Sequence, residues 1–430
     1  MNPRWFFVLT SLLTLVASVE AQRPAVVAYP NAYAPIVTNL GVADPYATVG
    51  VRPAGWFGNN GLALPTRQSI GSRLWLRAEY LHWWTEGMDT PALVTTSTAG
   101  TPQNQAAILG EPGASILFGG REINDDSESG IRTRAGFWLN SQRAFAIESE
   151  YFQLRDQDDR YNASGDGSNI VGRPFFDITN GRETAQLVSF PGLVSGAVSI
   201  GSKTELKSFL LNGRASLCPT HGSACDAPGQ HDRVDWIVGY RYLELDDRIT
   251  FAESLNSLVP TAPGTLGISE SFRTKNEFNG LQLGVVYQAN FRRAWLESLL
   301  RVAVGHNTQK VQIQGGTAIT ENGTTDNFSG GLLAQRTNIG NFERDQFTMI
   351  PEIGLTFGFR VTDWMHATVG YTVLYYPSVV RAGDQIDTDV NPNLLAPEMN
   401  PFSGTLRPRF QYNESDYWAQ GINLGAEFRF

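Results

Sequence analysis

The sequence has little charge for its length and, beyond its first 21 residues, no long apolar run. Asp, Glu, Lys and Arg make up 17% of the 430 residues, whereas about a quarter is usual in soluble domains. No later stretch approaches the roughly 20 apolar residues of a membrane-spanning helix, and the mean hydropathy is −0.20. The formal net charge of −9 argues against nucleic acid as a partner. These absences exclude a helical membrane protein and disfavour an ordinary soluble domain.

Histidine and cysteine are scarce, which limits catalysis and metal binding. Hydrolases need a histidine oriented by a carboxylate, or a serine together with both. No such motif surrounds any of the five histidines, which are His82, His221, His231, His306 and His366. We therefore predict that the protein is not an enzyme and holds neither a cofactor nor a metal.

The chain ends in a segment whose side chains alternate between apolar and polar. Ile422, Leu424 and Phe428 fall on one face, whereas Asn423 and Glu427 fall on the other. Period two is that of a β-strand. A large apolar face opposite a small or charged face fits a strand with lipid outside and water or polar side chains inside. An exported chain without spanning helices has essentially one architecture left for crossing a membrane, the closed β-barrel.

Ten segments from residue 73 onward are strand candidates, and several reach the roughly 9–11 residues that a tilted barrel strand needs. They are residues 73–84, 130–139, 143–154, 204–217, 233–245, 272–289, 294–305, 352–361, 366–376 and 417–430. Long and short connections alternate between them, which places every long loop outside the cell and every short turn in the periplasm. We predict an all-β protein, a transmembrane antiparallel up-and-down β-barrel over residues 73–430 in the bacterial outer membrane, with ten strands or, alternatively, twelve.

The first 21 residues have the pattern of a secretory signal peptide. Arg4 gives a positive start, the mostly apolar stretch 5–16 follows, and a small-residue cleavage site ends at Ala21. An uncleaved anchor is the alternative, although no stop-transfer pattern follows. Residues 22–72 are rich in Pro, Gly, Ala and Asn, and we expect an irregular segment, either a periplasmic linker or an arm that enters the lumen. In the oxidising periplasm, Cys218 and Cys225 are expected to form a disulfide.

Glycine and tryptophan positions support the assigned faces. The glycines expected to face inward, where they allow tight curvature, are Gly136, Gly239, Gly284, Gly305, Gly354, Gly358, Gly370, Gly421 and Gly425. Tryptophans near strand ends are expected to form interface girdles, with strand propensity as the alternative explanation. They are Trp83, Trp84, Trp138, Trp236, Trp295, Trp364 and Trp418. We expect the eighth strand to begin after Pro351, because proline interrupts strand pairing.

Charged residues on the inward faces form the candidate functional site. If residues 140–142 are the turn, Arg134 lies opposite Glu148 and Arg132 lies opposite Glu150, and opposite charges stabilise such cross-strand pairs. Further inward charges are Arg214, Asp235, Arg241, Glu297, Arg301, Glu352 and Arg360.

The closing seam of the barrel is expected to carry more of these charges. Arg77 and Glu79 of the first strand would neighbour Glu427 and Arg429 of the last. The whole set is either a polar conduit whose field biases solutes or a network that fills a narrow lumen. Ten strands favour a narrow or plugged lumen.

Several motifs together resemble a known family. They are residues 79–84 (EYLHWW), 91–95 (PALVT), 117–120 (LFGG), 130–132 (GIR), 173–176 (RPFF), 370–375 (GYTVLY), 380–387 (VRAGDQID) and 418–425 (WAQGINLG). The set is similar to a planctomycete outer-membrane family known as putative β-barrel porin family seven, over about residues 73–430. The resemblance implies a porin-like outer-membrane barrel and supplies no catalytic or binding residues. Phe430 also resembles the last-strand signal that barrel-assembly machinery reads.

We expect a passive function. Porin-like diffusion of small polar solutes and a structural role in the envelope both fit the pattern. The alternative is a surface binding or adhesion protein that acts through its long extracellular loops. The expected partners are outer-membrane lipid, the barrel-assembly machinery and small polar solutes.

Overall fold

The computed structural model describes residues 73–140, 143–217, 232–397 and 403–430. The predicted signal peptide 1–21, the predicted irregular segment 22–72 and the disulfide predicted between Cys218 and Cys225 lie outside the described residues, so they stay predictions. In the part of the chain that is described, none of the helices has the length and apolar character needed to cross a bilayer.

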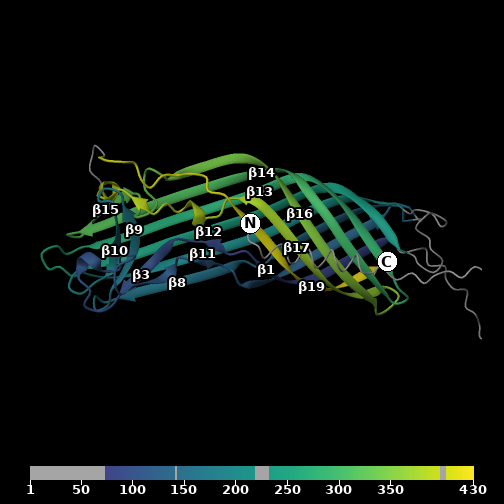
Figure 1. Ribbon diagram of the computed structural model, residues 1–430, viewed down its shortest axis with the longest axis horizontal. Coiled ribbons are helices and arrows are strands. Elements are labelled where there is room, and N and C mark those ends of the chain that lie inside the picture. The colour runs from purple at the N-terminus through teal and green to yellow at the C-terminus, as the bar shows by residue number, and fades with distance from the viewer. Residues whose placement is uncertain (1–72, 141–142, 218–231, 398–402) are drawn as a thin grey trace, which may run out of the picture. The chain divides into compact units, whose positions relative to one another are not determined.

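Ten antiparallel strands close into a barrel, which confirms the predicted fold and strand number (Figure 1). They are β1 (Leu74–Thr85), β6 (Ser127–Trp138), β7 (Phe145–Leu154), β11 (Val194–Ser216), β12 (Arg233–Ser257), β13 (Thr265–Asn290), β14 (Ala294–Glu321), β16 (Gly340–Arg360), β17 (Met365–Val379) and β19 (Ser415–Arg429). Each pairs with the next in this order, and β19 pairs with β1 to close the ring. Short connections such as 291–293 lie at one end, the turn end, and the long connections lie at the other, the loop end.

Alternation along the strands separates an apolar outer surface from a polar interior, as predicted. On β19, Asn423 and Glu427 are 1% and 2% exposed, whereas Ile422 and Leu424 are 37% and 49% exposed. All ten strands contribute to this outer belt, which includes Leu76, Ile131, Phe137, Ile147, Phe209, Leu211, Val238, Leu281, Leu283, Leu300, Leu355, Phe357, Phe359, Val369, Ile422 and Leu424. Exposed apolar surface this extensive is typical of contact with lipid.

Five strands continue well beyond their predicted ends at the loop end. The structure begins β11 at residue 194, β13 at 265 and β16 at 340, and it ends β12 at 257 and β14 at 321. In these added parts Val198 and Ile200 are buried inside the sheet, while Ser199 between them faces outward. The prediction required an apolar outward face, and it missed these parts because their outward residues are small and polar.

Pro351 lies inside β16, so the prediction that this strand begins after it is wrong. Pro351 is opposite Val302 of β14, but the pairing of β16 with β17 begins only at Glu352. The missing N–H group therefore falls where the strand has a partner on one side only, a position that proline tolerates.

The long connections fold into a layer of their own, which we call the cap. Its strands are β2 (Met88–Asp89), β3 (Ala92–Ser97), β4 (Ala114–Gly119), β5 (Glu122–Ile123), β9 (Val171–Asp177), β10 (Arg182–Ser189) and β18 (Asp389–Val390). The order β10-β9-β3-β4 forms one sheet, to which β18 is added, and β2 pairs with β5. Three single-turn 3₁₀ helices, η1 (Gln103–Gln105), η2 (Gly383–Gln385) and η3 (Pro392–Leu394), lie in the same connections. Two further strands, β8 (Gln157–Gly165) and β15 (Thr324–Ser329), extend the barrel sheet beside β11 and β14.

Apolar side chains of the cap pack against the inner face of the prolonged barrel strands. Val94 of β3 and Phe175 of β9 share one buried cluster with Ile249, Phe272 and Ile313 of the wall. Burial of this apolar area supplies the main stabilisation of the cap on the wall. The loop end is therefore covered by a packed layer rather than by irregular loops.

The predicted tryptophan girdle is only partly correct. Trp84, Trp236 and Trp364 are exposed on the outer surface, as a girdle requires, but Trp83, Trp138 and Trp295 are only 0%, 8% and 3% exposed and face the lumen. The prediction considered distance from the strand end and ignored which face each residue occupies.

Inward glycines make room for the inward tryptophan rings. A Cβ atom at Gly136 would lie 1.9 Å from the Trp75 ring, and one at Gly358 would lie 2.1 Å from the Trp295 ring. A tryptophan that covers a glycine on the neighbouring strand also shields its backbone and fills the space of the missing side chain.

We predict that Gly358→Ala destabilises the barrel by about 1–3 kcal/mol, because the added methyl group overpacks the Trp295 ring. The matched control is Gly213→Ala, where a Cβ atom meets nothing nearer than 3.6 Å. The midpoint of thermal unfolding, followed by circular dichroism in detergent, should fall for the first variant only. Equal midpoints for the two variants would contradict the packing argument.

Candidate functional site in the barrel lumen

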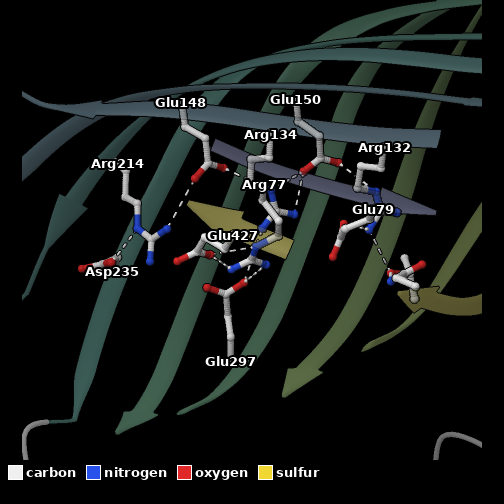
Figure 2. Close-up of polar contacts among 12 residues, drawn as sticks. Arg77, Glu79, Arg132, Arg134, Glu148, Glu150, Arg214, Asp235, Glu297 and Glu427 are labelled. Carbon is white, nitrogen blue, oxygen red and sulfur yellow. Dashed lines mark hydrogen bonds and ion pairs between the residues drawn. The ribbon is translucent and has the colours of Figure 1, made fainter. Parts of the chain in front are cut away.

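Charged side chains from eight strands fill the lumen toward the turn end, and we call them the lumen cluster. Figure 2 shows most of them, without Arg241, Arg301 and Glu352. They are Arg77 and Glu79 (β1), Arg132 and Arg134 (β6), Glu148 and Glu150 (β7), Arg214 (β11), Asp235 and Arg241 (β12), Glu297 and Arg301 (β14), Glu352 (β16) and Glu427 (β19). None is more than 7% exposed. All of them fall on the inward faces predicted from alternation.

Arg77 links the closing seam to the opposite wall. Its Nη2 atom lies 2.5 Å from Glu427 Oε2, and its Nη1 atom lies 3.1 Å from Glu297 Oε1. Arg134 Nη1 reaches the same Glu297 oxygen at 3.4 Å. Because β1 and β6 are not neighbours of β14 in the sheet, these pairs cross the lumen and connect walls that share no backbone hydrogen bonds.

Glu150 is the centre of a second set of pairs. Its carboxylate lies 2.7 Å from Arg134 Nη2 and 2.7 Å from Arg301 Nη2. Arg301 also pairs with Glu352, whose Oε2 atom lies 2.9 Å from Arg241 Nη2. A continuous series of ion pairs therefore links β6 and β7 through β14 to β16 and β12.

Arg132 lies where the cluster meets aromatic side chains. It is opposite Phe152 in the ladder and not opposite Glu150 as predicted, although its Nε atom is 3.8 Å from a Glu150 oxygen. Its guanidinium carbon lies 5.1 Å from the centre of the Trp83 ring, within range for cation–π attraction. Glu79, whose Oε2 atom is 3.7 Å from Arg132 Nη1, completes its surroundings.

The predicted register of the hairpin between β6 and β7 is wrong by two residues. Arg134 lies opposite Glu150 and not opposite Glu148. The hairpin is closed by the backbone hydrogen bond from Leu139 N to Phe145 O, so the connection spans residues 140–144 and is longer than the three-residue turn that we assumed.

The seam prediction is correct for one pair. Arg77 lies opposite Glu427, and the two form an ion pair. Arg429, at the turn end, pairs with Glu427 at 2.6 Å. Glu79 pairs instead with Arg132 of β6, inside the lumen. Arg360 is exposed at the end of β16, so its predicted place in the lumen network is wrong.

Arg214 carries the network to the turn end. Its Nε atom donates to Asp235 Oδ2 at 2.6 Å, and its Nη1 atom lies 3.4 Å from Glu148. Asp235 also accepts from Arg233 at 2.7 Å. This part of the network is partly open to solvent through Arg233, whose side chain is 20% exposed.

The described part of the lumen has no water-wide passage at the level of the cluster. Side chains lining a water-filled channel would remain accessible to solvent, and those of the cluster are at most 7% exposed. Toward the loop end, an apolar layer follows whose members are fully buried: Leu81, Trp83, Phe152, Leu243, Phe278 and Tyr376. The cap then covers the loop end, so the lumen is blocked at three successive levels.

Two more buried arginines fasten the cap to the barrel wall. Arg173 of β9 pairs with Glu253 of β12 at 3.0 Å and with Glu270 of β13 at 2.6 Å. Arg381, just beyond β17, pairs with Asp247 of β12. Neither arginine was among the predicted inward charges. The one signal was that both arginines fall in motifs 173–176 and 380–387, which carry the family resemblance.

Side chains able to bind a metal do not lie together in the described residues. No set of three or more His, Cys, Asp and Glu side chains there is placed to hold a metal ion. His82 and His306 lie on outward faces, where their rings contact Trp84 and Phe347.

One carboxylate at the loop end is poorly compensated. Glu86 directly follows β1, and its Oε2 atom is buried without a hydrogen-bond partner. Burial and the neighbouring Asp416 carboxylate raise the pKa of Glu86 from 4.5 to about 7, against the opposing effect of Arg381. This side chain therefore changes its charge near neutral pH, where the barrel meets the cap.

Comparison with known proteins identifies a family and distant structural likenesses. The family model described as Putative beta barrel porin-7 matches residues 75–430. No curated protein is similar enough to match. The Escherichia coli outer membrane protease OmpT has 9% identity and a TM-score of 0.36, over 83% of this chain and 97% of that chain. A Pseudomonas aeruginosa FadL homologue has 9% identity and a TM-score of 0.23, over 84% and 90%. Likenesses this distant carry no argument for function.

We predict that Glu150→Gln lowers the free energy of unfolding by about 3–5 kcal/mol, because it leaves buried guanidinium groups without their shared carboxylate. Glu205→Gln is the control, since Glu205 pairs with Lys203 at the surface and is 30% exposed. That exposed pair should contribute at most about 1 kcal/mol. Urea unfolding in detergent measures both. Similar losses in the two variants would show that the lumen cluster does not depend on Glu150.

Glu86 should make stability depend on pH. Its folded pKa is raised, so the protonated form is favoured in the folded state, and stability is lost as pH rises from about 4.5 through about 7. We expect the unfolding midpoint of the wild type to fall over this range, and Glu86→Gln to reduce the fall. If the two proteins had the same pH profile of thermal unfolding, the assignment to Glu86 would be wrong.

Proposed function

This chain belongs to the family described as Putative beta barrel porin-7, and from its closed lumen we propose that it is an outer-membrane β-barrel with a structural role in the envelope, which holds its folded cap at the cell surface. One observation carries this proposal. The charged side chains that fill the lumen are at most 7% exposed, so a solute has no passage through the barrel in this conformation.

The outer-membrane location rests on four features. The outer belt fits lipid, and short turns at one end with long connections at the other are typical of bacterial outer-membrane barrels, whose long loops face the outside. The predicted signal peptide would supply export. Phe430, which is 61% exposed and donates its backbone N–H to Leu74 O at 2.9 Å, would be the terminal residue that the assembly machinery recognises.

Passive diffusion of small polar solutes is the second candidate, which the family description and the polar lumen cluster favour. Diffusion would require the buried ion pairs to separate, the apolar layer to part and the cap to move. Breaking one buried pair without a replacement partner already costs several kcal/mol. An open state is therefore rare unless a ligand or partner stabilises it. Binding through the exposed surface of the cap is compatible with the structural role.

Planar-bilayer recording tests the proposal. We expect the purified wild-type protein to insert without stepwise conductance, and we expect silence to persist when residues 22–72 are removed, because the cluster and the apolar layer close the lumen by themselves. A conducting porin recorded in the same bilayers is the positive control.

A cluster variant gives the matching positive result. Replacing Arg77, Arg134, Glu150 and Arg301 by Ser opens the level of the cluster, Phe152→Ser and Phe278→Ser open the apolar layer, and deletion of residues 92–119 and 171–189 removes most of the cap. With all three changes combined, we expect current steps if the folded barrel persists. Stepwise conductance of the wild type would instead support the diffusion candidate and overturn the structural role.

A further inference from the structure

All four lysines of the chain lie together on the outward face of the barrel wall. Lys203 and Lys207 are on β11, Lys275 is on β13 and Lys310 is on β14. The chain has 33 lysines and arginines in total, of which the other 29 are arginines spread over the chain. Lysine is thus restricted to one patch on neighbouring strands.

Three of the lysines form a continuous row with two glutamates, which we call the lysine row. Lys207 Nζ lies 2.8 Å from Glu244, Glu244 lies 3.5 Å from Lys275 Nζ, and Glu277 bridges Lys275 Nζ at 2.7 Å to Lys310 Nζ at 2.6 Å. The row crosses β11, β12, β13 and β14, which are adjacent in the sheet. Three amines and two carboxylates leave one net positive charge within the row, and the exposed Glu343 of β16 lies opposite Lys310 at its end.

The lysine row lies immediately beyond the outer belt toward the loop end. Lys207 is on the same face as Phe209, two residues nearer the loop end, and Phe209 is 42% exposed. On β12 the exposed Tyr240 lies on the same face as Glu244, four residues nearer the turn end. Amines at this height meet the headgroup layer of a bilayer, to which long cationic side chains extend from an apolar surface.

Beyond the row and a few more paired charges, the outward face becomes small and uncharged. The outward residues there are Ser195, Ala197, Ser199, Thr250, Ala252, Ser254, Asn256, Thr265, Gly267, Ser269, Ser271, Gln312, Gln314, Gly316, Ala318 and Thr320. We call this set the hydroxyl face. It contains a hollow of about 360 Å³ lined by residues that include Ser164, Ser199 and Ser254.

We propose that the outer belt, the lysine row and the hydroxyl face together form a docking surface for a phosphorylated glycolipid of the outer leaflet. Acyl chains would lie on the belt, phosphate groups on the amines, and sugar hydroxyls against the hydroxyl face. The order of the three chemistries along β11–β14 is the order of the three parts of such a lipid. This inference rests on the proposed outer-membrane location, with the loop end outside.

Competition from the two glutamates does not prevent phosphate binding. Glu244 and Glu277 are only 7% and 19% exposed, whereas the side chains of Lys207, Lys275 and Lys310 are 36%, 28% and 43% exposed, so the amines rather than the carboxylates are open to a ligand. An ammonium group has three donors, so a phosphate oxygen can be accepted beside the carboxylate or in its place. Lysine suits this role because its charge sits on a flexible stem that follows a mobile headgroup.

The test measures which lipids remain bound after extraction. The wild type is reconstituted in phosphatidylcholine vesicles that contain rough lipopolysaccharide, phosphatidylglycerol or a neutral galactolipid, and retained lipid is counted by native mass spectrometry. We expect strong retention of lipopolysaccharide, weaker retention of phosphatidylglycerol and little retention of galactolipid. Equal retention of lipopolysaccharide and phosphatidylglycerol would show recognition of phosphate alone and overturn the glycolipid assignment.

The row variant is Lys207→Gln, Lys275→Gln and Lys310→Gln combined. We expect it to retain lipopolysaccharide at least about tenfold less well, because each lysine near a headgroup surface adds roughly a fivefold preference. The control combines Arg121→Gln, Arg182→Gln and Arg409→Gln, three exposed arginines in the long connections, with the same change in net charge. Equal losses in row variant and control would reduce the effect to net charge and overturn the proposal.

A third variant, Ser254→Trp, fills the hollow of the hydroxyl face and should lower retention of lipopolysaccharide but not of phosphatidylglycerol. If this variant retained both lipids as well as the wild type does, the sugar would not contact the hydroxyl face, and the glycolipid assignment would be wrong. Insertion and conductance of all variants are recorded separately in pure phosphatidylcholine bilayers. A variant that inserts without conductance but loses lipopolysaccharide has lost lipid recognition, whereas a conducting wild type would contradict the proposed closed barrel.

Discussion

The structure depends on one constraint, which is that charges excluded from water must find partners of opposite sign. The lumen of a ten-stranded barrel is too narrow to hydrate a layer of side chains from all walls. Moving an isolated ion into such surroundings costs far more than any single contact returns. Arg77 and Arg134 therefore reach across to Glu297 on the opposite wall, in addition to their partners Glu427 and Glu150 on the neighbouring strands.

The same narrowness explains the other contents of the lumen. Trp75 and Trp295 fit only because glycines at 136 and 358 leave space for their rings. The fully buried apolar layer, with Phe278 and Tyr376, then fills the volume that charges cannot fill without more partners. At the loop end the barrel wall consists of the prolonged strands β11–β14 and β16, which form a curved sheet with an apolar inner face. The cap supplies the second layer that such a sheet requires.

Alternation is a local property, and the sequence therefore predicted the ten strands, the outward face and thirteen inward charges that the barrel places in its lumen. The prediction stopped where Ser199 and similar residues replace apolar ones, because it needed lipid on one side of every strand. Pairs such as Arg77 with Glu297 join residues 220 positions apart, and spacing carries no information about which walls face each other. The error at Arg134 arose from a turn two residues longer than assumed, since register depends on the turn.

The ion pairs of the cap bear on its purpose. Buried pairs such as Arg173 with Glu253 and Glu270 add little to stability compared with apolar residues of the same size, but they penalise any arrangement in which the partners separate. The apolar cluster beneath the cap would alone tolerate several ways of packing. Arg173 and Arg381 instead connect the cap to fixed points on β12 and β13, so it presents one defined surface. A barrel built for diffusion has no need to hold its outer loops in a single arrangement, whereas a barrel that displays a surface does.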